Sequence, residues 1–246
     1  MASKQAGIGR IENVPLTEQA RSAILEAIIE KRFDERLPSE EALAEMLNVS
    51  RTTIRTALQS LEQEGIITRK RAIGTTVNAH VRPSTMALQR MVGFDGLLKE
   101  NGYEVAVEVK WERSAPRKDF IKAFSLEPSQ DSLLTEKSYF ADGKLAIFVR
   151  DAMPWSNLKD QDFDRPVPAS IFEFASSDWA IPVDHAVAEI LPVVKRSAET
   201  TKVPIAKGDA ITRLHEYHYD TRGDQLAVSM VDLDTEFIRF EVFRRL

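Results

Sequence analysis

One segment, Ser50-Arg51-Thr52-Thr53-Ile54-Arg55, restricts what this chain can fold into more than any other stretch. Ser50 is a preferred N-cap residue, because its hydroxyl can accept hydrogen bonds from the free N–H groups of a first helical turn. Gly65 follows where a left-handed C-cap is needed. The pattern predicts an amphipathic helix that begins at Arg51 and ends before Gly65. The residues on its apolar face are Ile54, Ala57, Leu58 and Leu61.

Two further helices are predicted upstream of this one. The first runs from a cap at Thr17 to about Lys31. The second begins after a cap at Ser39, where two glutamates in the first turn suit the helix dipole. Asn48 is suited to the left-handed conformation that closes this second helix. The side chains expected to pack inward are Ala20, Ile24, Ala27, Ile28, Leu43, Met46 and Leu47.

A hairpin is predicted directly after the third helix. Residues 66–68 have the composition of a strand, residues 69–73 form a basic tip, Gly74 permits a tight reversal and residues 75–77 return. Three helices followed by a hairpin are typical of a winged helix-turn-helix, in which the start of the third helix enters a DNA groove. The alternative is a small helical domain whose basic hairpin is merely solvated.

Residues 37–77, LPSEEALAEMLNVSRTTIRTALQSLEQEGIITRKRAIGTTV, resemble the DNA-binding domain of the GntR family of bacterial transcription regulators. The most specific parts are SRTTIR, the LEQEG turn and the wing at Gly74. By this resemblance, the start of the third helix is expected to contact bases or phosphates, and Gly74 to reach the minor groove. The full set of expected DNA-contacting residues is Ser39, Ser50, Arg51, Thr52, Thr53, Arg55, Arg69, Lys70, Arg71 and Gly74.

One residue departs from the family pattern. The family usually has an arginine directly after the PSE triplet, and this chain has Glu41 there. A carboxylate cannot grip a phosphate or a guanine edge. The resemblance therefore implies either an operator that differs from the common one or compensation by Arg36.

The net charge of −5 is unusual for a DNA-binding protein, but the charge is unevenly distributed. Residues 1–80 carry 11 basic and 11 acidic residues, whereas the rest of the chain carries 22 and 27. Within residues 51–75, five basic residues oppose only two acidic ones. This local excess is the expected electrostatic footprint for DNA.

The composition argues against several other classes of protein. The chain has no cysteine, which excludes disulfides, thiol catalysis and thiolate metal sites. Its four histidines form no cluster at metal-ligand spacing, so no metal and no cofactor are expected. The polar start, residues 1–10, does not resemble a signal peptide, and no apolar run approaches a membrane span. A cytoplasmic protein without a membrane partner is expected.

A second domain is predicted after a short linker. Residues 79–90 show no sustained periodicity and contain Arg82-Pro83-Ser84, which is typical of a linker. An amphipathic helix with Phe94, Leu97 and Leu98 follows and stops at Asn101-Gly102. The chain is therefore divided into a tail (1–14), a DNA-binding domain (15–78), a linker (79–90) and a second domain (91–246).

The second domain contains a weak internal repeat. Residues 112–115 recur as 195–198, and the hairpin around Asp142-Gly143 recurs around Asp220 and Gly223. Together with strands near 104–112 and 184–194, the two hairpins predict an antiparallel sheet. Helices near 117–125 and 169–177 are expected to cover it. The predicted fold class is α+β.

This order resembles the UTRA effector domain of the HutC subfamily, which has a chorismate-lyase-like fold, over roughly residues 90–246. The resemblance implies a small metabolite bound between two half-sheets, and a homodimer formed by the same domain. The segments that carry it are Ala141-Asp142-Gly143, Met153-Pro154, Ser170-Ile171-Phe172 and Arg239-Phe240-Glu241-Val242.

Several polar residues of this domain are candidates for effector binding. Ser170 is expected to cap a helix, whose N-terminus could bind an anion or could be an ordinary cap. Sugar-phosphate-binding relatives tend to carry two arginines where this chain has Lys137 and Tyr139, which argues against a dianionic phosphate and leaves a carboxylate possible. Asp232 could instead receive an ammonium or hydroxyl group. Any single exposed charge could equally be a solvated surface group. The candidates are Lys137, Tyr139, Arg150, Asp151, Ser170, Tyr217 and Asp232.

Three functions compete at this point. The first is a homodimeric repressor that reads an inverted repeat in double-stranded DNA and responds to a small effector. The second is a chorismate-lyase-like enzyme domain tethered to a DNA-binding domain, although no nucleophile–base pair is evident and no catalytic residue is assigned. The third is an architectural DNA-binding protein whose second domain is filled by its own side chains.

Overall fold

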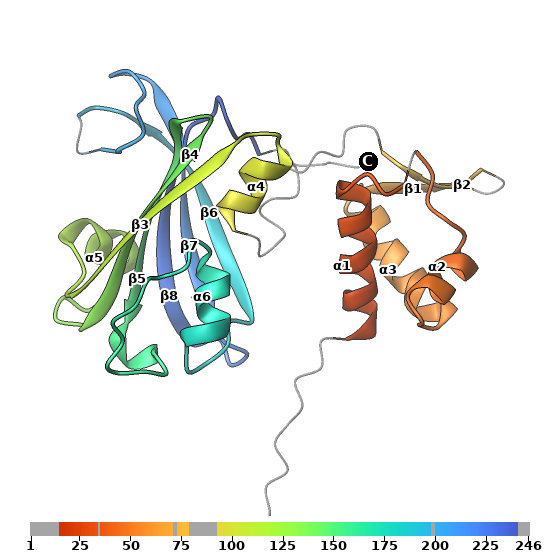
Figure 1. Cartoon of the computed structure of the whole chain (residues 1–246), viewed down its shortest axis with the longest axis horizontal. Helices are drawn as coiled ribbons and strands as arrows, with labels where there is room; N and C mark the ends of the chain where they lie inside the picture. Colours follow the sequence, from red (N-terminus) through yellow and green to blue (C-terminus); the bar gives the residue numbers. More distant parts are fainter. Residues whose placement is uncertain (1–14, 34, 71–72, 79–92, 198–199, 241–246) are drawn as a thin grey trace, which may run out of the picture. The chain divides into compact units, whose positions relative to one another are not determined.

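A computed structural model of the chain describes residues 15–33, 35–70, 73–78, 93–197 and 200–240 (Figure 1). The described residues form two compact units, one within 15–78 and one within 93–240. The expected tail (1–14) and linker (79–90) lie outside the described residues, as do Arg71 and the last two residues of Arg239-Phe240-Glu241-Val242.

The first unit contains three helices and a hairpin in the predicted order. Ser39 Oγ accepts a hydrogen bond from Ala42 N at 3.1 Å, and Ser50 Oγ accepts one from Thr53 N at 3.1 Å, so both predicted caps are confirmed. Asn48 and Gly65 both have positive φ, at 51° and 73°. The elements are α1 (Leu16–Ile29), α2 (Glu40–Met46), α3 (Arg51–Gln63), β1 (Ile67–Lys70) and β2 (Gly74–Val77).

Two local predictions in this unit were wrong. The first helix is capped by Pro15, whose carbonyl accepts from Glu18 N and Gln19 N, so Thr17 lies inside the helix. Met46 is 63% exposed, because it stands at the end of a seven-residue helix, beyond the buried positions Leu43 and Ala44. The apolar face of α3 is confirmed, since its four predicted residues are buried.

The hairpin is held against both the helices and the segment that precedes α2. β1 and β2 pair from Ile67↔Val77 to Lys70↔Gly74. Leu37 N donates to Thr75 O at 3.0 Å, and Arg36 forms a bridge with Thr76. Gly74 has φ +97°, which strongly favours glycine. Gly74 thus has the conformation predicted for it, whereas Arg69 and Lys70, which were predicted to lie in the tip, belong to strand β1.

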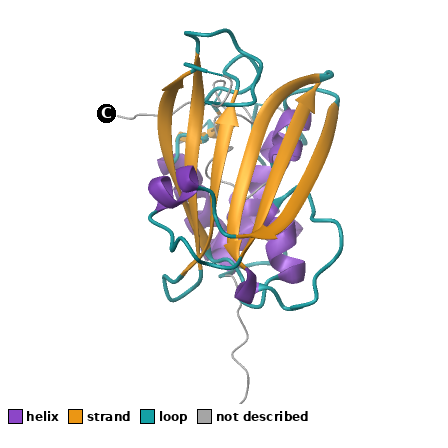
Figure 2. Cartoon of the chain, turned by 90° about the vertical axis from the view of Figure 1, so that its left-hand side faces the viewer, coloured by secondary structure: helices purple, strands orange, loops and turns teal. Residues whose placement is uncertain are grey.

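The second unit is one six-stranded antiparallel sheet with the strand order β3-β4-β5-β8-β7-β6 (Figure 2). The repeat predicted from the sequence appears as two β-meanders, β3-β4-β5 and β6-β7-β8, which meet at their last strands. Asp142 (φ 49°) and Gly143 (φ 78°) make the turn of the first hairpin. The strands are β3 (Val105–Ser114), β4 (Ser132–Ala141), β5 (Lys144–Pro154), β6 (His185–Val194), β7 (Ala210–Tyr219) and β8 (Gln225–Leu233).

Helices cover both faces of this sheet (Figure 1). On one side α4 (Phe94–Glu100) and α6 (Ile171–Asp178) pack on a core that includes Tyr139 and Leu133; we call this the α6 face. On the other, α5 (Lys118–Phe124) packs on a smaller core that includes Val228 and Met230; we call this the α5 face. A 3-10 helix, Trp155–Asn157, follows β5. The predicted α+β class is confirmed.

The two halves of the sheet are joined directly rather than separated. β5 pairs with β8 from Ile147↔Leu233 to Ala152↔Val228. The resemblance implied a ligand between two half-sheets, but backbone hydrogen bonds occupy that seam. Space for a ligand must therefore lie on one face of the continuous sheet.

Candidate DNA-reading surface and ligand site

The first turn of α3 presents polar side chains to solvent. Ser50 caps the helix, and its hydroxyl also lies 2.8 Å from Thr53 Oγ1. Arg51, Thr52 and Arg55 are exposed, whereas the opposite side of the helix is buried. Such an arrangement leaves guanidinium and hydroxyl donors free to approach base edges and phosphates.

A glutamate connects three elements of this surface. Glu40, the first residue of α2, accepts from Arg55 Nη2 at 3.2 Å through Oε2. Through Oε1 it accepts from Arg69 Nη2, on β1. Both arginines were predicted as DNA-contacting residues, but Glu40 was missed because its only sequence signal is an acidic residue in a first helical turn. The carboxylate holds two cations of the reading surface in place before DNA is bound.

Other contacts fix the hairpin and α1 relative to α3. Arg69 N donates to Glu62 Oε1 at 3.2 Å. Arg21 Nε and Nη2 reach Glu64 at 2.8 and 2.5 Å, a bidentate pair that ties α1 to the end of α3. The reading residues therefore stand on a small rigid scaffold.

The remaining predicted DNA-contacting residues occupy different positions. Ser39 uses its hydroxyl to cap α2, and Lys70 and Gly74 are exposed on the hairpin. Arg71 lies outside the described residues. Glu41, which departs from the family pattern, is exposed beside Glu40, and Arg36 is exposed on the segment paired with β2.

In the second unit, the structure separates the predicted effector residues into two groups. Lys137, Tyr139 and Asp151 alternate onto the α6 face, where Ser170 caps α6 with its hydroxyl 3.3 Å from Glu173 N. Arg150, Tyr217 and Asp232 point to the α5 face. Because the sheet lies between the groups, one small ligand cannot contact all seven residues.

The α6 face contains a buried polar cluster formed by one row of neighbouring strands. Thr135, Asp151, Ser229 and Glu216 are successive cross-strand partners on β4, β5, β8 and β7. Two further buried side chains complete the cluster, which consists of Thr135, Lys137, Asp151, Glu216, His218 and Ser229. Six polar residues in the middle of an apolar core are costly unless they are paired or have a function.

Asp151 is the best-paired member of this cluster. Lys137 Nζ lies 2.9 Å from Asp151 Oδ2, and Thr135 Oγ1 donates to the same oxygen at 2.5 Å. Burial raises the pKa of Asp151, but the charge of Lys137 and the hydrogen bonds from Ser229 and Thr135 outweigh it and the pKa is lowered. Asp151 is therefore an anion, compensated by one buried cation.

The neighbouring titratable groups tend towards their neutral forms. Burial, together with the charge of Asp151, raises the pKa of Glu216 to about 7. Burial lowers the pKa of His218 to about 4, so its ring is neutral, with Nε2 3.0 Å from Ser229 Oγ. Groups perturbed in this way are concentrated at functional sites, although structural networks also produce them.

Two atoms of the cluster have no hydrogen-bond partner among the described residues. They are Asp151 Oδ1 and His218 Nδ1, and both side chains are almost fully buried. Leaving such atoms unsatisfied costs about 1–3 kcal/mol each. A bound water or a polar ligand would remove that cost.

Two helix starts meet beside the cluster. A Cβ at Gly93, directly before α4, would stand 3.0 Å from Ser170 Cβ at the start of α6. Tyr139 contacts both helix starts. Its hydroxyl donates a hydrogen bond to Ala169 O at 2.6 Å, and its ring packs edge-on against Phe94 with 6.0 Å between the ring centroids. Tyr139 therefore anchors the helix start, while Lys137 and Asp151 supply the charges.

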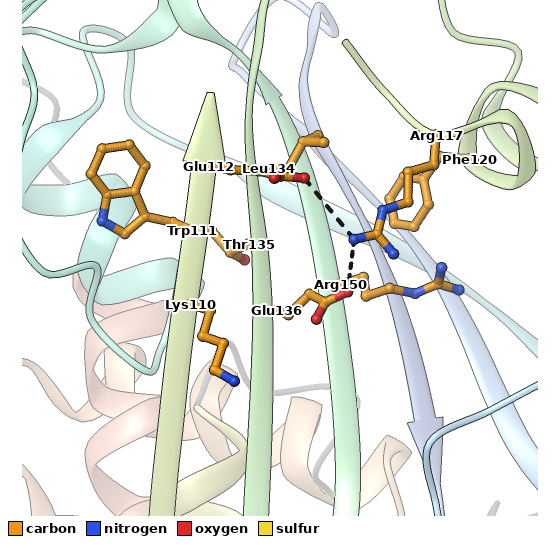
Figure 3. Close-up of a pocket in the computed structure, with 9 residues that line it drawn as sticks. All are labelled: Lys110, Trp111, Glu112, Arg117, Phe120, Leu134, Thr135, Glu136 and Arg150. Carbon is orange, nitrogen blue, oxygen red and sulfur yellow. Dashed lines mark ion pairs between the residues drawn. The ribbon is translucent and has the colours of Figure 1, made fainter. Parts of the chain in front are cut away.

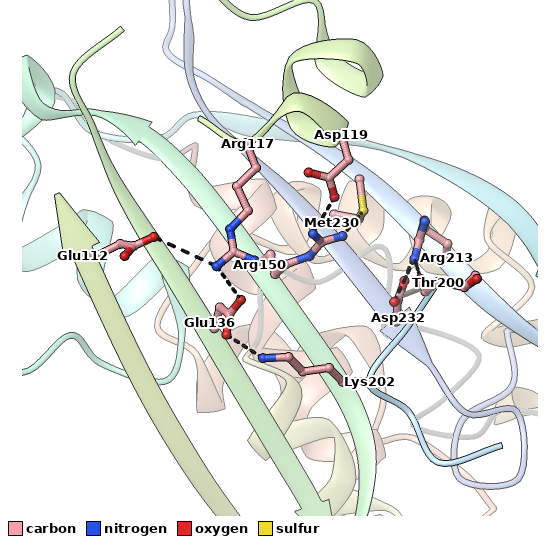
Figure 4. A network of polar contacts seen from close by, with 10 residues as sticks. All are labelled: Glu112, Arg117, Asp119, Glu136, Arg150, Thr200, Lys202, Arg213, Met230 and Asp232. Atoms are coloured by element: carbon pink, nitrogen blue, oxygen red, sulfur yellow. Dashed lines mark hydrogen bonds and ion pairs between the residues drawn. The ribbon is translucent and has the colours of Figure 1, made fainter. Parts of the chain in front are cut away.

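Two of the predicted residues on the α5 face, Arg150 and Asp232, already have ion-pair partners in the protein (Figure 4). Arg150 Nη1 lies 2.6 Å from Asp119 Oδ2, and Asp232 receives two hydrogen bonds from Arg213, at 2.6 and 2.9 Å. Tyr217 packs edge-on against Phe124 of α5. Asp232 and Tyr217 thus serve the packing of the sheet in this structure.

Sequence reasoning missed Thr135, Glu216 and Ser229, and it interpreted His218 as a residue that only fills a sheet face. Alternation along the strand could have placed Thr135 on the face of Lys137, but placing Glu216 beside them requires the pairing of the two hairpins. Among the described residues, no three His, Cys, Asp or Glu side chains are placed so that they could hold a metal ion together. Nor does any described helix combine the length and apolarity needed to cross a membrane.

Comparisons with known proteins agree with this geometry. Residues 16–77 match the family model described as bacterial regulatory proteins, gntR family. The chain is 24% identical over 232 residues to the HTH-type transcriptional regulator GgaR of Escherichia coli (strain K12), covering 92% of this chain and 84% of GgaR.

Two crystal structures share the fold along most of the chain. One is the possible transcriptional regulator YydK from Bacillus subtilis (TM-score 0.65, 18% identity, 94% of this chain and 100% of YydK). The other is PhnF from Mycobacterium smegmatis (TM-score 0.53, 16% identity, 92% of this chain and 99% of PhnF). The fold of this chain, over both of its units, is thus similar to that of proteins with known crystal structures.

Proposed function

We propose that this chain is a transcription regulator of the GntR type, and specifically a repressor whose operator affinity is changed by a small metabolite. The observation that carries the proposal is the combination of an exposed basic helix start in one unit with a buried, incompletely hydrogen-bonded polar cluster in the other. The first suits a DNA groove, and the second suits a small polar ligand.

The DNA-reading part of the proposal rests on α3 and the hairpin. Arg51 and Arg55 contact base edges or phosphates, with Thr52 and Thr53 beside them. Lys70 and Gly74 bring the hairpin to the neighbouring groove. We assign this role to residues 15–78, and the effector role to residues 91–246 as a UTRA domain of the HutC subfamily, joined by a linker at 79–90.

The effector site lies on the α6 face, beside Lys137, Asp151 and Ser170. Asp151 Oδ1 is a buried acceptor, so the ligand donates a hydrogen bond from a hydroxyl or an ammonium group. Lys137 and the start of α6 can receive a carboxylate. The favoured effector is therefore a carboxylate or an amine of metabolite size, without a dianionic phosphate.

The second unit also forms a homodimer in this proposal. β6 is an edge strand whose outer side pairs with no strand of the described chain. It exposes three large apolar side chains, Val187, Ile190 and Val194, each about half exposed. A long apolar edge is a liability unless another chain covers it. A second copy of β6 would cover it and give two reading helices for an inverted repeat.

The proposed regulation is a coupling between two binding equilibria, and such coupling is reciprocal. A thermal-shift screen of carboxylates, amines and amino sugars would find the ligand, since a ligand bound only by the native state raises the melting temperature. Operator DNA can be selected from a random duplex library with the full chain. This DNA must then lower the protein's affinity for the ligand by the same factor by which the ligand lowers its affinity for DNA. A ligand that binds without any change in DNA affinity would refute the repressor mechanism.

The competing enzyme function has one observation in its favour. Glu216, with a pKa of about 7, has the proton affinity of a general acid or base. We propose nevertheless that the cytoplasmic protein binds its ligand without converting it. Incubation of the full chain with the identified ligand, followed by mass spectrometry, decides this: unchanged ligand supports the regulator, and a new product supports the enzyme.

A further inference from the structure

A cavity of about 190 Å³ opens on the α5 face, where α5 no longer covers the sheet (Figure 3). Its walls come from three adjacent strands and from α5 with the residue before it. The lining residues are Lys110, Trp111 and Glu112 of β3, Leu134, Thr135 and Glu136 of β4, Arg150 of β5, and Arg117 and Phe120. Apart from Thr135, which belongs to the buried polar cluster, none of them is assigned a role by the function proposed above.

This cavity is separate from the buried polar cluster. Alternation places Glu136 and Arg150 on the α5 face, and their chain neighbours Lys137 and Asp151 on the α6 face. Thr135 belongs to the cluster and lines the cavity only where β4 passes between the two faces. A ligand in the cavity therefore does not touch the proposed effector site.

One cation of the cavity is fixed in position. Arg150 has a side chain only 16% exposed, with Nη1 2.6 Å from Asp119 Oδ2 and Nη2 2.8 Å from Met230 Sδ. Its guanidinium also lies over the Phe120 ring, 5.2 Å from the centroid. The position of this guanidinium is set by contacts with side chains on two elements, α5 and β8.

The other cations are freer. Arg117 is 55% exposed, and its Nη2 lies 3.2 Å from Glu136 Oε1 but 4.0 Å from Glu112 Oε1. Glu136 is also held by Lys202 at 2.6 Å (Figure 4). Lys110 is exposed and has no ion pair with any described residue. Arg117 and Lys110 can therefore turn to a ligand while Glu136 keeps Lys202.

The balance of charge and apolar surface limits what fits. The lining has three cations, Lys110, Arg117 and Arg150, against two carboxylates, Glu112 and Glu136. Phe120 and Leu134 supply apolar surface between them. A guanidinium fork matches a carboxylate, and the volume suits a molecule of roughly ten non-hydrogen atoms, smaller than a drug-sized ligand.

We propose that this cavity binds a small monocarboxylate with an apolar body, such as an aromatic or short-chain fatty acid. The carboxylate contacts Arg117 and Lys110, with Arg150 adding a fixed positive charge. The apolar body lies on Phe120 and Leu134. The protein thus has a second ligand site, on the opposite side of the sheet from the first.

The test is isothermal titration of the full chain with benzoate and hexanoate, and with benzylamine and benzyl alcohol as matched cationic and neutral probes. We expect saturable binding of at least one carboxylate at millimolar concentration or below. The amine and the alcohol should bind at least about tenfold more weakly, because they lack the charge-assisted hydrogen bonds. Absence of saturable carboxylate binding, or equal binding of benzyl alcohol, overturns the proposal.

Variants separate this site from the effector site. Arg117→Gln and Lys110→Gln, both exposed and expected to fold, should each weaken the carboxylate about tenfold. Ser170→Ala, on the α6 face, should leave the affinity of the protein for the carboxylate unchanged. Unchanged binding in both cavity variants, or loss of binding in Ser170→Ala, overturns the assignment. These titrations contain no DNA, so their outcome is distinct from that of the repressor test.

Discussion

Arg55 Nη2 lies 3.2 Å from Glu40 Oε2, so an arginine of the reading helix is ion-paired before any DNA is present. The same carboxylate also binds Arg69 of the hairpin. Arg55 is 63% exposed, and an exposed pair of this kind contributes little to stability. Its effect is therefore expected on DNA binding, where Glu40 orients two cations and at the same time partly neutralises them.

Replacement of that carboxylate should strengthen DNA binding. In Glu40→Gln, Arg55 and Arg69 are no longer neutralised, so the affinity for non-specific duplex DNA should rise. The slope of log K against log salt concentration should also become steeper, by the amount that corresponds to roughly one additional phosphate contact. Fluorescence anisotropy across a salt series measures both. Glu26→Gln, an exposed glutamate on α1 outside the predicted DNA-contacting residues, is the matched control. An unchanged slope in Glu40→Gln would show that the ion pair persists on DNA.

Arg51→Ala should weaken operator binding by about 1–3 kcal/mol, the cost of a lost bidentate base contact. Arg51 is exposed at the first position of α3, so the fold should be unaffected. Fluorescence anisotropy at fixed salt measures the operator affinity. The control is Arg32→Ala, which replaces an exposed arginine outside the reading surface. Equal operator affinity for the two variants would remove Arg51 from the interface.

Lys137→Met should destabilise the second unit strongly, by about 3–5 kcal/mol, because it leaves the buried Asp151 carboxylate without its cation. The double variant Lys137→Met/Asp151→Leu should recover most of that loss, since no unpaired charge is left. Urea unfolding of the four proteins of this double-mutant cycle gives the coupling energy. Additive effects of the two substitutions would mean that the 2.9 Å contact contributes no coupling.

The pH dependence of stability should change in Glu216→Gln. A carboxyl with pKa about 7 when folded and an ordinary value near 4.5 when unfolded holds its proton only in the folded state between these values. Its contribution is therefore present below about pH 4.5 and is lost as pH rises to about 7. Relative to the parent, Glu216→Gln should gain up to about 1.4 kcal/mol per pH unit across that window.

His218 acts in the opposite direction and must be included. Its lowered pKa of about 4 means that the unfolded chain binds the extra proton between pH 4 and its ordinary 6.5, so its contribution grows as pH rises. In the parent protein the two slopes largely cancel. Urea unfolding from pH 4.5 to 8 should reveal a rising slope only in Glu216→Gln. Parallel curves for parent and variant would show that Glu216 is ionised in the folded state.

Ile190→Glu should convert the proposed dimer to monomers. Ile190 is 50% exposed on the edge strand β6, and a charge there opposes strand pairing with a second copy. Light scattering coupled to size exclusion measures the mass. Lys144→Gln, at the start of β5 and away from β6, makes the same change of one negative unit in net charge and is the control. A parent protein that elutes as a monomer would contradict the dimer directly.

Local chemistry allowed much of the fold to be predicted from the sequence. The hydroxyls of Ser39 and Ser50 cap the helices as expected, and the positive φ angles fall at Asn48, Gly65 and Gly74. The four apolar positions of α3 are buried, because a period of 3.6 residues leaves one face for the core. The gntR-type reading domain and the α+β class follow from such patterns.

The candidate ligand site could be predicted only in part. Lys137, Asp151 and Ser170 were identified from the resemblance, but Arg150 and Asp232 were grouped with them although they lie across the sheet. Glu216 and Ser229 were missed because their proximity to Asp151 depends on the pairing of β5 with β8 and of β8 with β7. Residues that are about 80 positions apart in the chain give no local signal of such contact.

The sequence by itself determined the caps of α2 and α3, the positions with positive φ and the buried face of α3, since each depends on residues within a few positions of one another. Only the tertiary structure decided which strands meet at the centre of the sheet, which charges share a face, and that Glu40 joins Arg55 to Arg69. The physical reason is that burial and ion pairing depend on distance in space, which the order of residues along the chain does not specify.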